Sequence, residues 1–241
     1  VALISLGGFT SPNIQAVAGE QYGLIYTSKY KRDDQGRMII KANGLPQVAS
    51  SVGQSGNPNA KFTAGFSNSF SYRNLKLSFL LDLKYGGDLL SRTIGDLRIN
   101  GVAKETAEYD RFNSDGKVST PYLFDGVYED GKQNTTYVSA QDYWGLSGKY
   151  SAWEGYVLDA SFLKLREVSL VYTFNKEMIE RTKFISRLEI SVYGRNLWTY
   201  APKFPHLDPE QNLTGVSNAR GLEFGIQPVP RTLGATLKAS F

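Results

Sequence analysis

Few residues in this sequence have the types and spacing that enzymatic chemistry requires. His206 is the only histidine among the 241 residues, and it stands in Lys-Phe-Pro-His-Leu-Asp-Pro-Glu with no nucleophile motif nearby. The prolines around it favour a loop over a positioned catalytic base. Because no Gly-x-Ser-x-Gly, His-Glu-x-x-His or P-loop pattern occurs, the sequence does not favour an enzyme.

Three acidic or polar clusters could bind a metal ion or form a pair of catalytic carboxylates. Asp125, Glu129 and Asp130 lie close together, but their spacing differs from that of a calcium-binding EF-hand loop. The segments 33–36 (Asp-Asp-Gln-Gly) and 113–116 (Asn-Ser-Asp-Gly) have the composition of tight turns. The absence of cysteine excludes thiolate metal sites and cysteine nucleophiles. We therefore predict turns in these segments and no metal or cofactor.

Aromatic side chains are the remaining candidates for ligand contact. The central part of the chain contains Tyr122, Phe124, Tyr128, Tyr137, Tyr143, Trp144 and Trp153. Such rings stack on sugars or peptide side chains, but they also pack inside a loop or against a partner protein. Packing is the better default. The weak candidates for substrate contact, all in long loops, are Tyr122, Tyr128, Tyr143, Trp144 and Trp153.

The composition indicates β structure and argues against nucleic acid as a partner. The chain contains 15 Tyr, 13 Phe and 24 Gly, an enrichment typical of strands and turns. The 27 basic and 23 acidic residues give a net charge of only +4, and no block of Lys and Arg stands out. A nucleic-acid-binding surface is therefore not expected.

Two neighbouring segments alternate between apolar and polar residues, with Asn68 and Leu80 as the exceptions. The apolar positions are Phe62, Ala64, Phe66, Phe70 and Tyr72, then Leu75, Leu77, Phe79, Leu81, Leu83 and Tyr85. A period of two over about eleven residues predicts a strand in each segment. Arg73-Asn74 leaves room only for a tight turn, so the two strands form a hairpin. Segments 187–200 and 231–241 alternate similarly, and 168–174 contains one more apolar row.

Strand length and connection length favour a membrane barrel over a soluble sandwich. Strands of soluble proteins usually have about 5–6 residues, whereas a transmembrane strand needs about 9–11. Aromatic residues near the strand ends fit interfacial girdles; they are Tyr72, Tyr85, Phe174, Trp198 and Tyr200. Short turns alternate with long connections, 86–156 and 201–230, as in outer-membrane barrels with long outer loops. A soluble β-sandwich that recognises carbohydrate remains the alternative.

The alternation also predicts which face of the sheet contacts lipid. The row that contains Phe79 is expected to face lipid, and the row that contains Ser78 to face the lumen with Lys76, Asp82 and Lys84. A charge facing lipid costs roughly 2–4 kcal/mol at the membrane midplane. Phe79→Arg should therefore impair assembly, whereas Ser78→Arg should not.

The sequence resembles the C-terminal region of SusC/RagA-type TonB-linked outer-membrane proteins. The matching segments follow the family's order and cover most of the chain; they are 18–46, 65–93, 126–144, 158–174, 191–210 and 227–241. Two short stretches are highly specific, Asp-Ala-Ser-Phe-Leu-Lys-Leu-Arg at 159–166 and Gly-Arg-Asn-Leu at 194–197.

The resemblance implies an all-β fold, made of the C-terminal strands of a plugged transmembrane barrel of about 22 strands with long extracellular loops. It implies a location in the outer membrane and TonB-dependent import of large nutrients such as oligosaccharides or peptides. A SusD-like surface lipoprotein would assist, and the TonB complex would supply the energy. The terminal Phe241 would be part of a signal for barrel insertion.

Several parts of such a transporter have no counterpart in residues 1–241. The plug domain, the TonB-contacting segment and the N-terminal strands are absent, and Val1 begins in mid-pattern without a signal peptide. We therefore expect a piece of a longer protein. The five to eight strands expected here are too few to close a barrel, and open edges in lipid would leave backbone groups unpaired. The remaining N-terminal portion of the same barrel and outer-membrane lipid are thus expected partners.

Overall fold

A computed structural model of the chain describes residues 2–180, 183–215 and 217–241. The chain divides into two compact units, each built from three separate segments. Unit 1 comprises Val1–Asn59, Gly87–Asp159 and Lys203–Ile226, and unit 2 comprises Ala60–Gly86, Ala160–Pro202 and Gln227–Phe241. The two units therefore alternate along the sequence.

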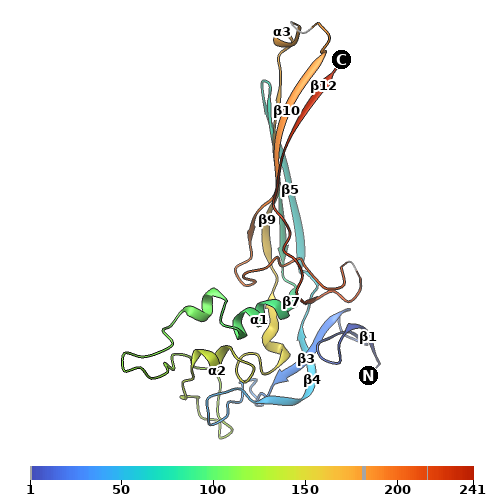
Figure 1. Ribbon diagram of the computed structural model, residues 1–241. Helices are drawn as coiled ribbons and strands as arrows, with labels where there is room; N and C mark the ends of the chain where they lie inside the picture. Colours follow the sequence, from blue (N-terminus) through green and yellow to red (C-terminus); the bar gives the residue numbers. More distant parts are fainter. Residues whose placement is uncertain (1, 181–182, 216) are drawn as a thin grey trace. The chain divides into compact units, whose positions relative to one another are not determined.

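Unit 2 is an antiparallel sheet of five strands in the order β12-β10-β9-β6-β5 (Figure 1). The strands are β5 (Phe62–Tyr72), β6 (Leu75–Tyr85), β9 (Phe162–Thr173), β10 (Arg187–Tyr200) and β12 (Thr232–Ser240). A short helix, α3 (Lys176–Ile179), lies between β9 and β10. The predicted hairpin is confirmed: Tyr72 pairs with Leu75, and Arg73 has the positive φ, 52°, that a two-residue turn needs at its first position. The strands predicted over 168–174, 187–200 and 231–241 are confirmed as well.

The register joins the apolar rows of the five strands into one face. One row crosses the whole sheet through Phe70, Leu77, Leu170, Val192 and Ala235. Because successive side chains of a strand point to opposite faces, the rows two residues above and below continue the same face. The predicted alternation therefore builds a continuous apolar surface.

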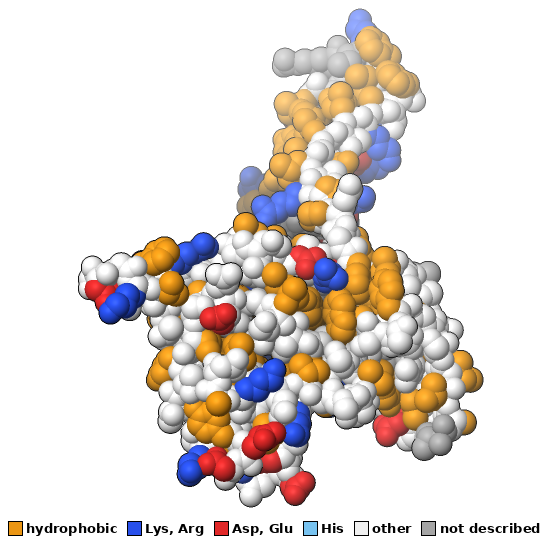
Figure 2. All heavy atoms as spheres, turned by 60° about the horizontal axis from the view of Figure 1, so that its bottom comes forward, with side chains coloured by type: hydrophobic (Ala, Val, Ile, Leu, Met, Phe, Trp, Pro, Cys, Tyr) orange, Lys and Arg blue, Asp and Glu red, His pale blue; other side chains and the backbone are white. Residues whose placement is uncertain are grey.

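This apolar face is exposed. Phe66, Phe70, Leu233 and Leu237 are among its exposed side chains, and Figure 2 shows hydrophobic side chains over much of the visible sheet. The described residues of unit 2 supply no second sheet to cover it. The packed layers of a β-sandwich are thus not seen in this unit, and a one-layer sheet with an apolar face of this size is unfavourable in water.

The opposite face of the same sheet is polar. Asp82 of β6 forms an ion pair with Arg166 of β9 at 2.6 Å. Glu167 of β9 forms one with Arg195 of β10 at 2.9 Å. Lys76, Asp82 and Lys84 share this face, as the alternation predicts. Its assignment to a barrel lumen stays a prediction.

Unit 1 contains two smaller sheets and several short helices. The first sheet has the order β1-β2-β3-β4, and the second has the order β11-β7-β8. The strands are β1 (Leu3–Gly8), β2 (Asn13–Val17), β3 (Leu24–Tyr30), β4 (Val48–Gly56), β7 (Asp88–Ser91), β8 (Val157–Asp159) and β11 (Leu222–Glu223). The helices are α1 (Arg92–Ile99), α2 (Ala140–Trp144) and two 3-10 turns, η1 (Lys104–Ala107) and η2 (Trp153–Tyr156). Within the described residues, no helix is long and apolar enough to cross a membrane.

The two long connections predicted at 86–156 and 201–230 are folded parts of unit 1. They contribute β7, β11 and the helices α1 and α2. Their apolar residues join a buried cluster with the N-terminal strands: Ile14 and Ile25 pack with Leu90 and Leu222, and all four side chains are fully buried. Unit 1 therefore has its own hydrophobic core.

Four short hairpins in unit 1 close with the same turn. Gly36, Gly44, Gly116 and Gly131 have φ between 77° and 82°, a left-handed conformation that glycine adopts without strain. The N–H of each donates to the carbonyl oxygen three residues earlier at 2.9 Å. The turns predicted at 33–36 and 113–116 are thereby confirmed, and Asp130-Gly131 belongs to a turn of the same kind.

Candidate ligand-binding site

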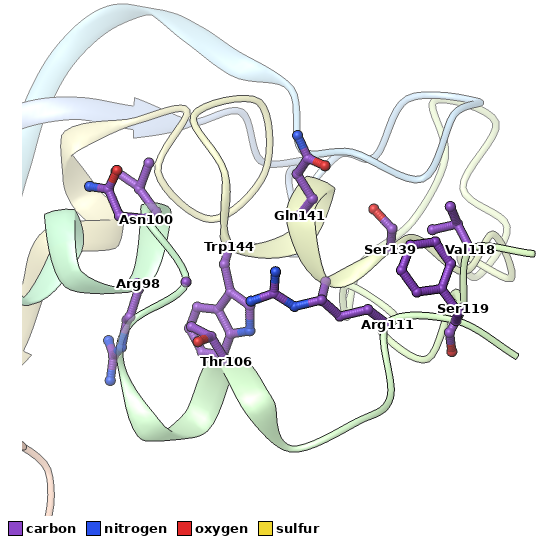
Figure 3. A pocket seen from close by; sticks show the side chains of 13 residues that line it. Arg98, Asn100, Thr106, Arg111, Val118, Ser119, Ser139, Gln141 and Trp144 are labelled. Carbon is purple, nitrogen blue, oxygen red and sulfur yellow. The ribbon is translucent and has the colours of Figure 1, made fainter.

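A cavity of about 370 Å³ lies in unit 1 between the end of α1, the start of α2 and the hairpin at 111–119 (Figure 3). Its volume is within the range of about 300–1,000 Å³ that is typical of small-molecule sites. Among the lining residues, two carry a positive charge, Arg98 and Arg111, and one carries an indole N–H donor, Trp144. Each comes from a different one of the three walls.

Helix α1 places Arg98 in the first wall. The helix begins after Ser91, whose Oγ accepts the N–H of Ile94 at 3.1 Å and donates to Oε2 of Glu223 at 2.6 Å. Ile94 and Arg98 are four residues apart and share one helix face, and both are buried. The Arg98 side chain is therefore directed into the unit.

The guanidinium of Arg98 contacts one carboxylate and two aromatic rings. Its Nε donates to Oε1 of Glu105 at 2.5 Å, and its Nη1 donates to the hydroxyl of Tyr150 at 3.1 Å. Its Cζ lies 5.3 Å from the centre of the Trp144 ring, and Nζ of Lys149 lies 4.9 Å from the same ring. Two cations therefore lie within cation–π distance of the indole.

Glu105 neutralises part of this positive charge. Its Oε2 lies 2.8 Å from Nε2 of His206. Burial alone would raise the pKa of Glu105, but hydrogen bonds from its own backbone N–H, Arg98 and His206 prevail and lower the pKa to about 2. Burial, followed by the charge of Arg98, lowers the pKa of Lys149, as expected where positive charge is concentrated.

Helix α2 places Trp144 in the second wall. The helix begins after Ser139, whose Oγ accepts the N–H of Asp142 at 3.1 Å and donates to its Oδ2 at 2.7 Å. Trp144 is 8% exposed. Its indole Nε1 is buried and has no hydrogen-bond acceptor among the described residues.

The hairpin at 111–119 forms the third wall. Phe112 and Val118 form an isolated bridge, and the N–H of Asn113 donates to the carbonyl oxygen of Lys117 at 2.8 Å. Arg111 stands at the base of this hairpin, and Figure 3 shows its side chain pointing toward Trp144. Within the described ranges, no acidic side chain forms an ion pair with Arg111.

The arrangement is suited to binding rather than to covalent catalysis. Two arginines and an unpaired indole N–H are donors, and the lining that the structure describes contains no acidic residue. The hydroxyls of Ser119 and Ser139 also line the cavity, and the lining that the structure describes contains no histidine. A ligand that accepts hydrogen bonds fits these walls.

The five aromatic residues considered as substrate contacts lie in different surroundings, and one of them, Trp144, lines the cavity. Tyr122 and Tyr143 stack with ring centres 4.4 Å apart, and Tyr143 lies 5.0 Å from Trp144. Trp153 packs on Tyr156 at 4.6 Å. These are contacts of packing, and substrate contact stays a prediction.

Tyr128, the fifth aromatic candidate, lies at a second and shallower hollow of about 550 Å³ that is also lined by Ile40, Gln47 and Glu129. Its hydroxyl is 2.6 Å from Oγ1 of Thr136. Because this hydrogen bond fixes the ring within its own hairpin, the contact is again internal to unit 1.

The acidic residues considered for metal binding have protein partners. Asp125 accepts from Gln133 at 3.3 Å, Glu129 pairs with Lys31 at 3.3 Å, and Asp130 pairs with Lys132 at 2.7 Å. Over the described part of the chain, no group of three or more His, Cys, Asp or Glu could hold a metal ion. His206 lies in a loop, as predicted, with a φ of 72°.

Arg98 and Arg111 were not singled out by the sequence analysis. Arg98 lies within an ordinary helical segment, and Arg111 lies in a loop without a recognisable motif. The turn predicted at 113–116 was the available signal for this hairpin. It places Phe112 opposite Val118, and so it places Arg111 at the base of the hairpin. The meeting of Arg111 with Trp144 depends on tertiary structure.

The chain is similar in sequence to part of a TonB-dependent receptor. It is 27% identical over 146 residues to TonB-dependent receptor P39 of Formosa agariphila, a match that covers 60% of this chain and 13% of the receptor. No family model matches the chain. The chain thus spans a small part of the length of this relative.

Solved structures resemble the chain over nearly its whole length. The RagAB peptide importer matches with a TM-score of 0.55 in its closed-closed state and 0.54 in its open-open state, at 16% identity in both cases. Each match covers 95% of this chain and 26% of the solved chain. The likeness shows the fold, and the predicted all-β class, a fragment of a β-barrel, is confirmed.

Proposed function

The resemblance to SusC/RagA-type TonB-linked outer-membrane proteins is confirmed, and from it we propose that residues 1–241 form the C-terminal part of a TonB-dependent importer of large nutrients. The importer takes up oligosaccharides or peptides across the outer membrane. Because the solved relatives are named as peptide importers, peptides are the better-supported nutrient. The process involves binding and movement, and no covalent chemistry.

The observation that carries this proposal is the exposed apolar face of the sheet in unit 2. Strands β5 and β6 each have 11 residues, which at about 3.3 Å per residue gives a length of about 36 Å. A strand of that length, tilted by about 35–45°, crosses an apolar band of about 25 Å. An apolar face on one side and ion pairs on the other match lipid outside and water inside a barrel.

The two edge strands of this sheet, β5 and β12, suggest that further strands pair with it. Among the described residues, β5 pairs only with β6, and β12 pairs only with β10. In lipid, each unpaired backbone group costs several kcal/mol, so both edges must be paired by other strands. We assign these strands to the remaining N-terminal portion of the same barrel.

Unit 1 is proposed to carry the surface that meets nutrient and partner. Two of its three segments, Gly87–Asp159 and Lys203–Ile226, are the long connections between strands of unit 2, and long connections lie outside the cell in outer-membrane barrels. A SusD-like lipoprotein is proposed to assemble there, in line with the RagAB assemblies. The TonB complex is proposed to act through parts of the transporter that lie outside residues 1–241.

The test combines purification and uptake. The full-length protein that carries this chain is tagged and extracted from outer membranes with detergent, and co-purifying proteins are identified by mass spectrometry. We expect a SusD-like lipoprotein in stoichiometric amount and uptake of labelled peptides or oligosaccharides that stops when TonB is deleted. A monomer that is folded in buffer without detergent, or uptake that is unchanged without TonB, would contradict the proposal.

A further inference from the structure

We propose that the cavity between α1, α2 and the hairpin at 111–119 binds an organic carboxylate. The Arg111 guanidinium and the Trp144 indole N–H are its two principal donors. The use of this site for nutrient uptake rests on the proposed function, whereas the binding itself does not. Acidic peptides and oligosaccharides of uronic acids both present such a carboxylate.

The first argument is the unpaired N–H of Trp144. Buried donors without an acceptor are rare in folded proteins, and each one calls for a physical reason. The ring of Trp144 packs on Tyr143 and lies within cation–π distance of Arg98 and Lys149, contacts that a phenyl ring could also make. The N–H adds nothing to that packing, and it belongs to a residue that lines the cavity.

The second argument is the position of Arg111. Its side chain points toward the indole (Figure 3), and no acidic side chain among the described residues pairs with it. The planar guanidinium matches the two oxygens of a carboxylate. A carboxylate that lies against Arg111 can also accept the hydrogen bond of Trp144.

The third argument is the sign of the charge around the cavity. Arg98 and Lys149 lie on the Trp144 ring, and Arg111 adds a third cation to this region. Glu105 is the carboxylate that pairs with Arg98, and its other oxygen is occupied by His206. A negatively charged ligand is therefore favoured over a neutral or cationic one.

The remaining lining distinguishes an organic ligand from an inorganic anion. Ile99, Phe112 and Val118 supply apolar surface, and Phe112 and Val118 are exposed large hydrophobic residues. A cavity of about 370 Å³ is much larger than a sulfate or phosphate ion. A carboxylate attached to an apolar side chain or to a sugar ring uses both kinds of wall.

Calorimetric titration of the full-length protein in detergent tests the proposal. The probes are the blocked tripeptide Phe-Glu-Phe with its neutral match Phe-Gln-Phe, a glucuronic acid trisaccharide with its neutral glucose match, and inorganic sulfate. We expect one acidic probe to bind at least about tenfold more tightly than its neutral match, the scale of one charge-assisted hydrogen bond. The acidic probe that binds identifies the source of the carboxylate.

Variants connect the binding to the two donors. Arg111→Gln should weaken binding of the acidic probe by about tenfold and leave binding of its neutral match unchanged, because the substitution removes one charged donor. Trp144→Phe keeps a ring and removes the N–H, and it should weaken binding of the same probe about fivefold and leave binding of its neutral match unchanged. Lys117→Gln, on the same hairpin but outside the lining, removes one charge as a control and should change affinity less than about twofold.

Three results would overturn the site: equal affinity for each acidic probe and its neutral match, equal affinity in the two donor variants and the parent protein, or sulfate bound as tightly as the organic acids. The importer proposal fails separately. If the protein binds carboxylates but shows no TonB-dependent uptake, the binding site is supported and the importer proposal is contradicted. If it imports nutrients but binds acidic and neutral probes equally, the binding site is contradicted and the importer proposal is supported.

Discussion

The two units place the same type of residue in opposite surroundings. In unit 1, the leucines Leu90 and Leu222 are 0% exposed and pack in a core. In unit 2, Leu233 and Leu237 are 79% and 68% exposed on the sheet. Unit 1 also closes its chain with short hairpins, whereas unit 2 runs in strands of 9 to 14 residues.

This difference indicates two different solvents. In water, apolar side chains must be buried, at about 25 cal/mol per Å² of surface removed, and unit 1 meets this requirement. In lipid, the apolar side chains gain nothing by turning inward, while backbone groups must all be paired. The long ladder of unit 2 pairs its backbone and exposes its side chains.

The largest expected effect comes from the same substitution made in each unit. Leu90→Ala leaves a cavity in the core of unit 1 and should destabilise that unit by about 2–5 kcal/mol. Leu237→Ala removes a side chain from the exposed face and should have a much smaller effect. Hydrogen exchange of the full-length protein in lipid vesicles measures both; equal losses of protection would remove the distinction between the units.

The second prediction concerns the two faces of unit 2. Phe79→Arg places a charge on the apolar face and should destabilise the inserted protein by roughly 2–4 kcal/mol. Ser78→Arg places it on the polar face, where Ser78 is 3.4 Å from Ser69, and should be tolerated. The folded fraction in outer membranes, from the shift in gel mobility on heating, checks both. If the two variants assemble equally well, the facing is wrong.

The third prediction concerns the buried charges of unit 1. Glu105→Gln leaves the mostly buried Arg98 without its carboxylate and should destabilise unit 1 by about 2 kcal/mol at neutral pH. The pKa of Glu105 falls from 4.5 to about 2 on folding, so the carboxylate stabilises the folded state fully above pH 4.5 and loses this effect as the pH falls toward 2.

The stability difference between parent and variant should therefore narrow below pH 4.5. Hydrogen exchange of α1 and η1 as a function of pH measures this difference. A difference that stays constant from pH 7 to pH 3 would show that the ion pair with Arg98 does not stabilise unit 1.

The smallest expected effect compares two glycines of the unit 2 sheet. A Cβ at Gly234 would lie 2.4 Å from Cζ of Tyr193, whereas a Cβ at Gly65 would meet nothing within 4 Å. Gly234→Ala should destabilise the sheet by about 1 kcal/mol because the ring must move. Gly65→Ala should stabilise it by about 0.5 kcal/mol. Urea unfolding in lipid vesicles gives both values, and the same sign for both would contradict the close packing of Tyr193.

Unit 2 could be predicted from the sequence because its signals are local. Alternation from Phe62 to Tyr85 fixes two strands, and the two residues Arg73 and Asn74 fix their turn. Unit 1 could not be predicted in the same way. Its strands β1 to β4 were missed, since they are short or polar and are paired with register shifts, as between Ser5 and Gly7.

The cavity was also beyond sequence reasoning. Trp144 was considered as a ring that could stack on a ligand, but its relevant group is the indole N–H. Arg98 and Arg111 come from two different elements, and their approach to Trp144 depends on how the 45 residues between Arg98 and Trp144 fold. Composition and spacing carry no information about that approach.

The small pairing between β7 and β8 has a consequence for the order in which the chain folds. Asp88 lies opposite Asp159, so this ladder joins the two ends of a connection of about 70 residues, whose closure entropy grows only with the logarithm of its length. Lys84 and Phe162, the next pair outward, are paired in β6 and β9. Once this connection has folded and β7 is paired with β8, Lys84 and Phe162 are held close together. The β6–β9 ladder can then form from this pair outward, one residue pair after another, during insertion.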